Sequence, residues 1–314
     1  MMFLAPFEAI DQGLVELKPV KDGANNSVAS FKYGAKQYFL KNYYPGKAGD
    51  KSRFDREIHF YEFLHEVGSK QVPKLLKKDH LRDRALFEFI SGSKLMGQVK
   101  WPEIQQCLDF FLEINCAKNK GIKLADAADT SRSPQQFVDN IEHRLKRFES
   151  AELNAELKNF TVKLRDKFNL LKSRIKLSAK ILGDNNLCLS PSDFGFHNAI
   201  EKDGEFYFFD FEYAGWDDPV KFICDFFCQP QNPVDEKYLS RFTEGVSSAF
   251  PSYTEMKNYV EILMPFCRIK WCCIILNSFL QEEKERRKFA GKAGFDHFNG
   301  QLNKAKDYYK KHLE

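Results

Sequence analysis

The sequence changes character near residue 91, and this change limits the folds that the chain can adopt. Residues 14–44 contain three short β-prone runs, "LVELKPVK", "SVASFKY" and "KQYFLKNYY", separated by the turn-prone stretches "DGANN" and "GAK". Apolar residues then recur near helical spacing over 52–69, and two more strand-like runs follow, "VPKLLKKDH" and "RALFEFISGSKL". Beyond them, helical periodicity dominates. We therefore predict an α+β fold: a small antiparallel β lobe with one helix (residues 1–91), then a larger, mainly helical lobe (residues 92–314).

Size and charge exclude some classes of function. The chain is 43% hydrophobic and 15% aromatic, which is enough apolar material for a sizeable core. Its net charge of +4 is small and its basic residues are dispersed, so no nucleic acid is predicted as a partner. The eight cysteines lie mostly in apolar stretches without C-x-x-C spacing, and we predict buried, reduced thiols.

The sequence also argues against a membrane protein. The most apolar segment, residues 262–280, is interrupted by Arg268 and Lys270, which favours a core helix over a membrane span. The N-terminal stretch before Glu8 is short and has no basic region ahead of it, so no secretory signal is predicted. We expect no membrane insertion and a cytoplasmic location.

A β-like island inside the helical region carries the candidate chemistry. It contains "LCLS", the loop "PSDFGFHN" and the run "AIEKDGEFYFFDFE", in which Asp203-Gly204 indicates a hairpin turn. Asn198 follows Asp193 by five residues, and Asp210 ends the second predicted strand. A kinase catalytic loop has an Asp for the attacking hydroxyl and, five residues later, an Asn that binds Mg²⁺; a second metal-binding Asp follows. We predict Asp193 as the catalytic base, and Asn198 and Asp210 as Mg²⁺ ligands.

The triplet Asp193-Phe194-Gly195 suggests a rival assignment, because protein kinases use the same triplet to bind metal. That assignment requires a catalytic Asp upstream with an Asn five residues after it. The nearby upstream candidate is Asp184, and position 189 is a leucine. We therefore place Asp193 in the catalytic loop and give Asp210-Phe211-Glu212 the place of the metal triplet.

The stretch "FDFEYAGWDDP" after the predicted hairpin resembles the aminoglycoside phosphotransferase and choline kinase family. That group has a loop of the form H-G-D-x-x-x-x-N and a metal strand that often has the sequence I-D-F-E-Y-A-G. This chain matches the loop at Asp193 and Asn198 but has Pro191-Ser192 where His-Gly is usual, a departure that removes a loop-bracing histidine. The resemblance implies a two-lobed, protein-kinase-like fold that transfers the γ-phosphoryl group of ATP or GTP, with Mg²⁺, to a hydroxyl of a small molecule.

Further site residues follow from this resemblance. A kinase-like fold needs a lysine on its third strand to hold the phosphates and a helix glutamate to orient it. We predict Lys41 and Glu57 for these places, with Glu62 and Glu66 of the same helix as alternatives to Glu57, and we expect Lys41 to face a solvent-filled cleft. The loop between the first two strands would meet the phosphates, and the crossover between lobes would bind the purine through its backbone. The nucleotide-binding residues predicted on these segments are Asn25, Asn26, Ser27, Glu88 and Ile90.

Four residues after the predicted hairpin are candidates for the acceptor pocket. Glu212, Trp216, Asp217 and Asp218 suit a small polar acceptor such as a sugar, aminoglycoside or amino alcohol, with a cationic one slightly preferred. One of the two aspartates is instead expected to cap a helix that begins near Pro219. His197 is expected to pack within its loop and not to act as a base.

Two alternatives come from other classes of function. A nucleotide-binding pseudokinase that acts as a scaffold is suggested by the missing loop histidine. A protein kinase is disfavoured, because no A-P-E-like segment follows Asp210 and the chain passes almost directly into a helix.

Overall fold

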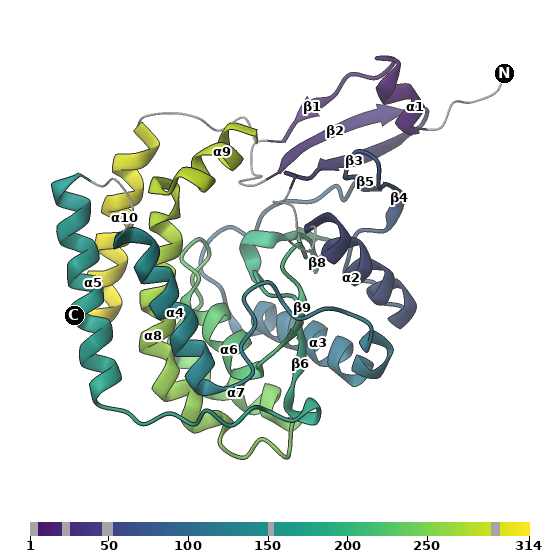
Figure 1. The fold of residues 1–314 in the computed structure, drawn as a ribbon. Coiled ribbons are helices and arrows are strands. Elements are labelled where there is room, and N and C mark those ends of the chain that lie inside the picture. The colour runs from purple at the N-terminus through teal and green to yellow at the C-terminus, as the bar shows by residue number, and fades with distance from the viewer. Residues whose placement is uncertain (1–5, 21–25, 46–52, 150–153, 290–295) are drawn as a thin grey trace.

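The N-terminal part of the protein is a five-stranded antiparallel sheet with the strand order β1-β2-β3-β5-β4 (Figure 1). The computed structural model describes residues 6–20, 26–45, 53–149, 154–289 and 296–314. The sheet strands are β1 (Lys18–Pro19), β2 (Ser27–Tyr33), β3 (Lys36–Asn42), β4 (Leu75–Asp79) and β5 (Arg84–Glu88).

Alternation along β3 separates the two faces of this sheet. Leu40 packs with Phe31 and Leu86 against Phe7 of a short helix, α1 (Pro6–Asp11), which the sequence analysis did not predict. Phe39 and Lys41 point to the opposite face, because successive side chains of a strand alternate. On that face lies the predicted helix, α2 (Arg53–Val67). Lys41 is therefore turned toward the interior between the lobes.

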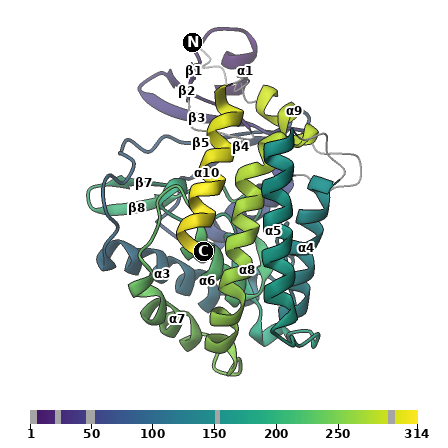
Figure 2. The same cartoon turned by 90° about the vertical axis from the view of Figure 1, so that its left-hand side faces the viewer.

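Most of the remaining chain is helical, as predicted. Helices α4, α5, α8 and α10 lie side by side at one flank of the molecule, which both views show (Figures 1 and 2). Helix α8 packs on α4, α5, α6 and α10, so the predicted core helix is confirmed. The helices are α3 (Trp101–Cys116), α4 (Pro134–Glu149), α5 (Ala155–Ser173), α6 (Pro219–Cys228), α7 (Leu239–Ser248), α8 (Met256–Leu276), α9 (Gln281–Phe289) and α10 (Asp296–Leu313).

Two small two-stranded sheets form the β-like island. In the predicted hairpin, β7 (Ala199–Lys202) pairs with β8 (Glu205–Phe208) through a two-residue turn. Both turn residues have positive φ, 56° at Asp203 and 83° at Gly204, as a hairpin turn of this twist requires. The second sheet joins β6 (Cys188–Ser190) to β9 (Gly215–Asp217), a three-residue strand that the sequence analysis missed.

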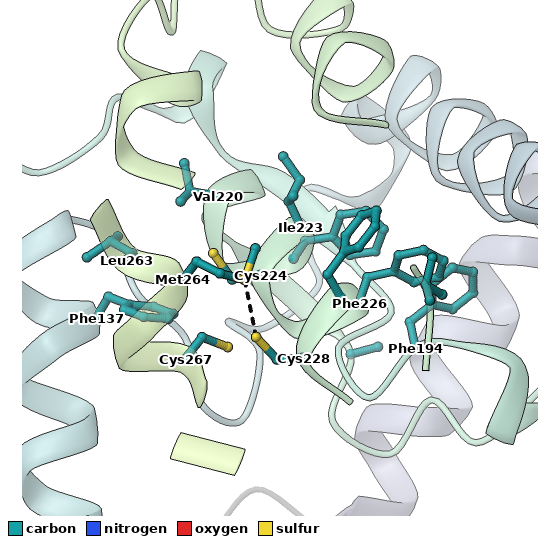
Figure 3. Close-up of a cluster of buried hydrophobic side chains, with 14 of the residues drawn as sticks. Phe137, Phe194, Val220, Ile223, Cys224, Phe226, Cys228, Leu263, Met264 and Cys267 are labelled. Carbon is teal, nitrogen blue, oxygen red and sulfur yellow. Dashed lines mark hydrogen bonds between the residues drawn. The ribbon is translucent and has the colours of Figure 1, made fainter. Parts of the chain in front are cut away.

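The core beneath the island is aromatic and rich in sulfur (Figure 3). Cys228 of α6 lies 3.2 Å from the sulfur of Met264 on α8. Phe194, from the loop that carries Asp193, packs against Phe226 of α6. All eight cysteines are free thiols, and seven are buried, Cys116 being exposed. Helix α6 thus supports the candidate loop from below.

One continuous core cluster includes residues of both the sheet region and the helical region. A boundary between lobes near residue 91 stays a prediction. Among the residues described, no helix combines the length and the apolar composition that are needed to cross a bilayer.

Candidate active site

Lys41, Glu57 and Asp210 form a buried ion cluster between the two parts of the molecule. The Lys41 Nζ atom lies 2.5 Å from Glu57 Oε2 on α2 and 2.5 Å from Asp210 Oδ1 in the segment after β8. Burial by itself would lower the pKa of Lys41, but the carboxylates of Asp210 and Glu57 outweigh burial and raise it. The ammonium is therefore charged. The expectation of a solvent-facing lysine is wrong: Lys41 is only 4% exposed, because α2 and the Asp210 segment close over it.

A third carboxylate completes an acidic cluster. Ligand oxygens of Glu57, Asp210 and Glu212 all lie within 4.8 Å of one another. Burial raises the pKa of Glu57 to about 7; the nearby Lys41 lowers it, and Asp210 and Glu212 raise it further. Burial is the largest cause of this higher pKa, and the three carboxylates leave an excess of negative charge beside the Lys41 ammonium. Such an excess suits a divalent cation, so the residues present fit the Mg²⁺ ion that the resemblance implies.

Two residues from the N-terminal part of the chain bind the side chain of Glu212. Asn26 donates from Nδ2 to Glu212 Oε2 at 2.5 Å, and Arg53 Nη1 lies 3.3 Å from Oε1. The Asn26 Oδ1 atom accepts from the Tyr44 backbone N–H at 3.1 Å. Both polar atoms of the Asn26 side chain therefore have partners within the protein. Ser27 begins β2, and Asn25 lies outside the described residues.

The Asp193 loop is closed by hydrogen bonds within itself. Asn198 donates from Nδ2 to the Asp193 carbonyl at 2.8 Å, so its Oδ1 atom points away from that carbonyl. His197 Nε2 lies 3.0 Å from Asp193 Oδ1. The Phe209 N–H donates to the Asn198 carbonyl at 3.0 Å, which holds the residue before Asp210 next to the loop. The structure therefore brings Asp193, Asn198 and Asp210 to neighbouring positions around the hairpin.

The backbone is strained at two points of the site. Ser192 and Asp210 have φ of 65° and 68°, and only four residues other than glycine in the described chain have a positive φ. Such conformations cost free energy and persist where surrounding contacts impose them. At Ser192 the contacts are a bond from its N–H to Ser190 Oγ, 3.1 Å, and one from its Oγ to the Tyr213 carbonyl, 2.9 Å.

The Asp-Phe pairs of the two candidate segments, Asp193-Phe194 and Asp210-Phe211, have different surroundings. Phe194 stacks on Phe110 of α3 and lies in the core of the helical part. Phe211 contacts Tyr61 of α2, and its N–H donates to Glu57 Oε1 at 3.1 Å. It is Asp210, and not Asp193, that pairs with Lys41. This arrangement agrees with the assignment chosen from the sequence, although the roles themselves stay predictions.

The crossover to the helical part follows β5. The Glu88 N–H donates to the Lys74 carbonyl at 2.9 Å, so this N–H is already used within the sheet region. Ile90 is 8% exposed. Purine recognition by this segment would rest on the Glu88 carbonyl and on the backbone of Ile90.

The suggestion that Asp217 and Asp218 contact an acceptor is wrong. Asp217 is fully buried and accepts from Lys221 Nζ at 2.7 Å and from the Ser131 N–H at 2.9 Å. Asp218 accepts from the Val220 N–H at 2.8 Å and caps α6, which confirms the capping alternative. Both carboxylates are used inside the helical part, because Asp217 of β9 is buried in the core and Asp218 caps α6.

Three residues of the site have partners that the sequence did not indicate. Glu212 was placed in the segment that replaces the metal triplet and was considered for the acceptor, Arg53 was not considered, and His197 was assigned to loop packing. Glu212 lies two residues after Asp210, and both follow the same predicted strand. This short spacing already indicated that the two carboxylates could lie close together. Nothing local to Arg53 or His197 indicated their partners, which lie on other segments or depend on how the loop turns.

The arrangement of fold and site defines a class of protein: a two-lobed α+β fold of the kinase type with an acidic, lysine-containing cluster between the lobes. Residues 16–228, more than half of the chain, match the sequence profile of the phosphotransferase enzyme family (APH). The chain belongs to this family, which confirms the resemblance found in the sequence.

Solved structures share the fold at low sequence identity. A choline kinase from Cryptosporidium parvum Iowa II has a TM-score of 0.54 at 13% identity, over 98% of this chain and 94% of that one. The aminoglycoside phosphotransferase APH(4)-Ia has a TM-score of 0.53 at 13% identity, over 98% of each chain. An amicoumacin kinase in complex with AMP-PNP, Ca²⁺ and Ami has a TM-score of 0.59 at 13% identity, over 98% of this chain and 94% of that one. No curated protein matches the sequence significantly.

Proposed function

We propose that the protein transfers the γ-phosphoryl group of ATP or GTP to a hydroxyl of a small polar molecule. The observation that carries the proposal is the Lys41 ammonium, held 2.5 Å from both Glu57 and Asp210, beside a loop that presents Asp193 and Asn198. Lys41 would hold the α- and β-phosphates, with Glu57 fixing its position. Such a site catalyses mainly by positioning its reactants and by stabilising charge.

Asp193 is the proposed base. Its side chain is 39% exposed, and it would orient or deprotonate the acceptor hydroxyl. Asp210, 35% exposed, and Asn198 are the proposed Mg²⁺ ligands. When bound, Mg²⁺ supplies positive charge to the phosphate oxygens of the nucleotide. The backbone at Asn26 and Ser27 would donate to phosphate oxygens, and the Glu88 carbonyl and Ile90 backbone would bind the purine.

The proposed acceptor is a small polar molecule: a sugar, an aminoglycoside or an amino alcohol. The family and the fold support a small molecule. The slight preference for a cationic acceptor loses the support of Asp217 and Asp218, since both are buried. Retention of Lys41, Asp193, Asn198 and Asp210 around one site favours an enzyme over a scaffold. The cytoplasmic location stays a prediction.

A nucleotide-consumption screen tests the proposal. The protein would be incubated with Mg²⁺ and ATP or GTP against matched panels of amino alcohols, aminoglycosides, neutral sugars and peptides. Phosphorylation of one small-molecule panel is the expected result, and Asp193→Asn protein is the matched control. Transfer to peptides alone, or nucleotide binding without transfer to any panel, would contradict it.

A further inference from the structure

The His197 imidazole is turned back onto the predicted base. His197 lies in a single 3-10 turn (Phe196–Asn198) just before Asn198, and its side chain is 9% exposed. Its Nε2 atom lies 3.0 Å from Asp193 Oδ1. A Cβ atom at Gly195 would come within 3.2 Å of His197 Nδ1, so glycine at 195 leaves room for the ring. The imidazole is therefore packed into a defined place beside the carboxylate.

The surroundings of the ring determine which nitrogen carries the proton. His197 Nδ1 is buried and has no hydrogen-bond partner in the part of the chain that the structure describes. A proton on Nδ1 would leave a buried N–H without an acceptor and would set the Nε2 lone pair against a carboxylate oxygen. A proton on Nε2 avoids both costs, since an unpaired buried donor is expensive. His197 accordingly donates from Nε2 to Asp193 Oδ1.

We propose that His197 is a positioning residue for Asp193, a role that rests on the proposed function. By holding Oδ1, it fixes the rotation of the carboxylate and leaves Oδ2 for the acceptor hydroxyl. Pro191 offers no donor to Asp193, and Ser192 gives its hydroxyl to the Tyr213 carbonyl. The loop thus lacks a brace on the N-terminal side of Asp193 and has one on the C-terminal side.

The backbone around His197 is fixed well enough for this task. Lys94 donates from Nζ to the His197 carbonyl at 2.6 Å, and Asn198 donates to the Asp193 carbonyl at 2.8 Å. The hydrogen bond between the His197 and Asp193 side chains therefore forms within a loop whose backbone is already fixed by other hydrogen bonds. Small misplacements of a catalytic group lower rates strongly, because reactive geometry is narrow.

The protonated nitrogen can be observed directly in the ligand-free protein. Two-bond ¹H–¹⁵N correlation spectra of uniformly labelled protein in mildly alkaline buffer report which nitrogen carries the proton in each neutral imidazole. The His197 signal is assigned by its absence from the His197→Gln spectrum. We expect Nε2 to be protonated and Nδ1 to be bare. An Nδ1-protonated ring would overturn the proposal, whatever the enzyme activity is.

The rate of phosphoryl transfer in His197 variants tests whether this hydrogen bond positions Asp193. His197→Leu removes the donor, whereas His197→Gln retains an N–H near the Nε2 position. With the acceptor found in the screen, we expect His197→Leu to lower kcat by about 10- to 100-fold with the Mg²⁺-nucleotide Kd unchanged, and His197→Gln to stay within about 5-fold of wild type. His143→Leu, at an exposed position of α4, controls for the substitution, and thermal unfolding checks that each variant folds.

The outcomes separate the two proposals. Wild-type kcat in His197→Leu, or equal losses in the Gln and Leu variants, would overturn the positioning role while leaving phosphotransfer intact. A wild-type protein that transfers phosphate to no acceptor would overturn the proposed function, and the spectrum would still decide the hydrogen bond.

Discussion

Asn26 and Glu212 are 186 residues apart in the sequence and share a buried hydrogen bond of 2.5 Å between Asn26 Nδ2 and Glu212 Oε2. Asn26 belongs to the segment that enters β2, and Glu212 follows the Asp-Phe pair of the acidic cluster. Glu212 is fully buried, and Arg53 is its ion-pair partner. A polar contact thus joins the sheet lobe to the segment of Asp210 and Glu212 across the site.

Asn26→Ala should destabilise the protein. The substitution removes one donor from a buried carboxylate, which typically costs about 1–3 kcal/mol. Asn26→Asp should cost more, because two carboxylates would then face each other. Urea unfolding of the single variants, Glu212→Gln and the double variant gives the coupling energy by a double-mutant cycle. A coupling energy indistinguishable from zero would mean that the two side chains do not interact in solution.

Lys41→Ala should destabilise as well as inactivate, because Lys41 is buried between Glu57 and Asp210. Removing one partner of a buried ion pair costs about 3–5 kcal/mol. Adding Glu57→Gln to Lys41→Ala should restore part of the loss, since one unpaired charge disappears. Lys36→Ala, on the exposed end of the same strand, is the control and should change stability little. Equal unfolding free energies for Lys41→Ala and Lys36→Ala would contradict the buried ion cluster.

Asp193→Asn and Asp210→Asn should separate catalysis from metal binding. Asp193→Asn should lower turnover by at least about 10²-fold, the scale for loss of a general base, and leave Mg²⁺-nucleotide affinity nearly unchanged. An asparagine at 193 can still accept from His197, so the loop is retained. Asp210→Asn should weaken Mg²⁺-dependent nucleotide binding, measured by calorimetry. The reverse pattern would exchange the roles of the two loops.

Two variants of Ser192 separate the cost of its strained backbone from the loss of its side-chain hydrogen bond. Ser192→Ala loses the bond to the Tyr213 carbonyl and keeps a side chain at φ of 65°, whereas Ser192→Gly loses the same bond and relieves the strain. We expect the Gly variant to be more stable than the Ala variant by about 1 kcal/mol. Thermal unfolding of the two variants measures the difference. A more stable Ala variant would show that the left-handed conformation carries no cost here.

Asp218 should make stability depend on pH. Burial raises the pKa of Asp218 to about 7, and the neighbouring Asp217 adds to the rise. The folded state therefore holds this proton more tightly than the unfolded chain does, where the ordinary value is 3.8. The resulting stabilisation is complete below 3.8 and is lost as the pH rises to about 7.

Asp218→Asn tests this dependence. Asparagine retains an oxygen for the Val220 N–H and cannot ionise, so the variant should lose less stability between mildly acidic and neutral pH than wild type does. Glu57, whose pKa is also raised, contributes the same slope to both proteins. Urea unfolding across this range measures the difference. Parallel curves for the two proteins would assign the slope to other groups.

Much of the fold could be predicted from the sequence, because the signals are local. Alternating side chains predict the strands of 14–44, helical spacing predicts α2 and α8, and Asp203-Gly204 predicts the hairpin turn. Short elements were missed, such as α1 and β9. Their few residues have no periodicity of their own, and they are held by partners far away in the chain: α1 by the outer face of the sheet and β9 by β6.

For the site, the sequence by itself determined the residue types and their order: a lysine on the third strand, an Asp and an Asn five positions apart, and an acidic pair after a hairpin. These features depend on residue type and on short-range spacing, so they can be recognised from the sequence alone. Only the tertiary structure decided which groups are buried and which partners they have. The packing of the two lobes buries Lys41 and brings Asn26 to Glu212. The turn of the loop brings His197 to Asp193, β9 buries Asp217, and the start of α6 engages Asp218. The free energies of these contacts depend on segments far apart in the chain that meet only when it folds.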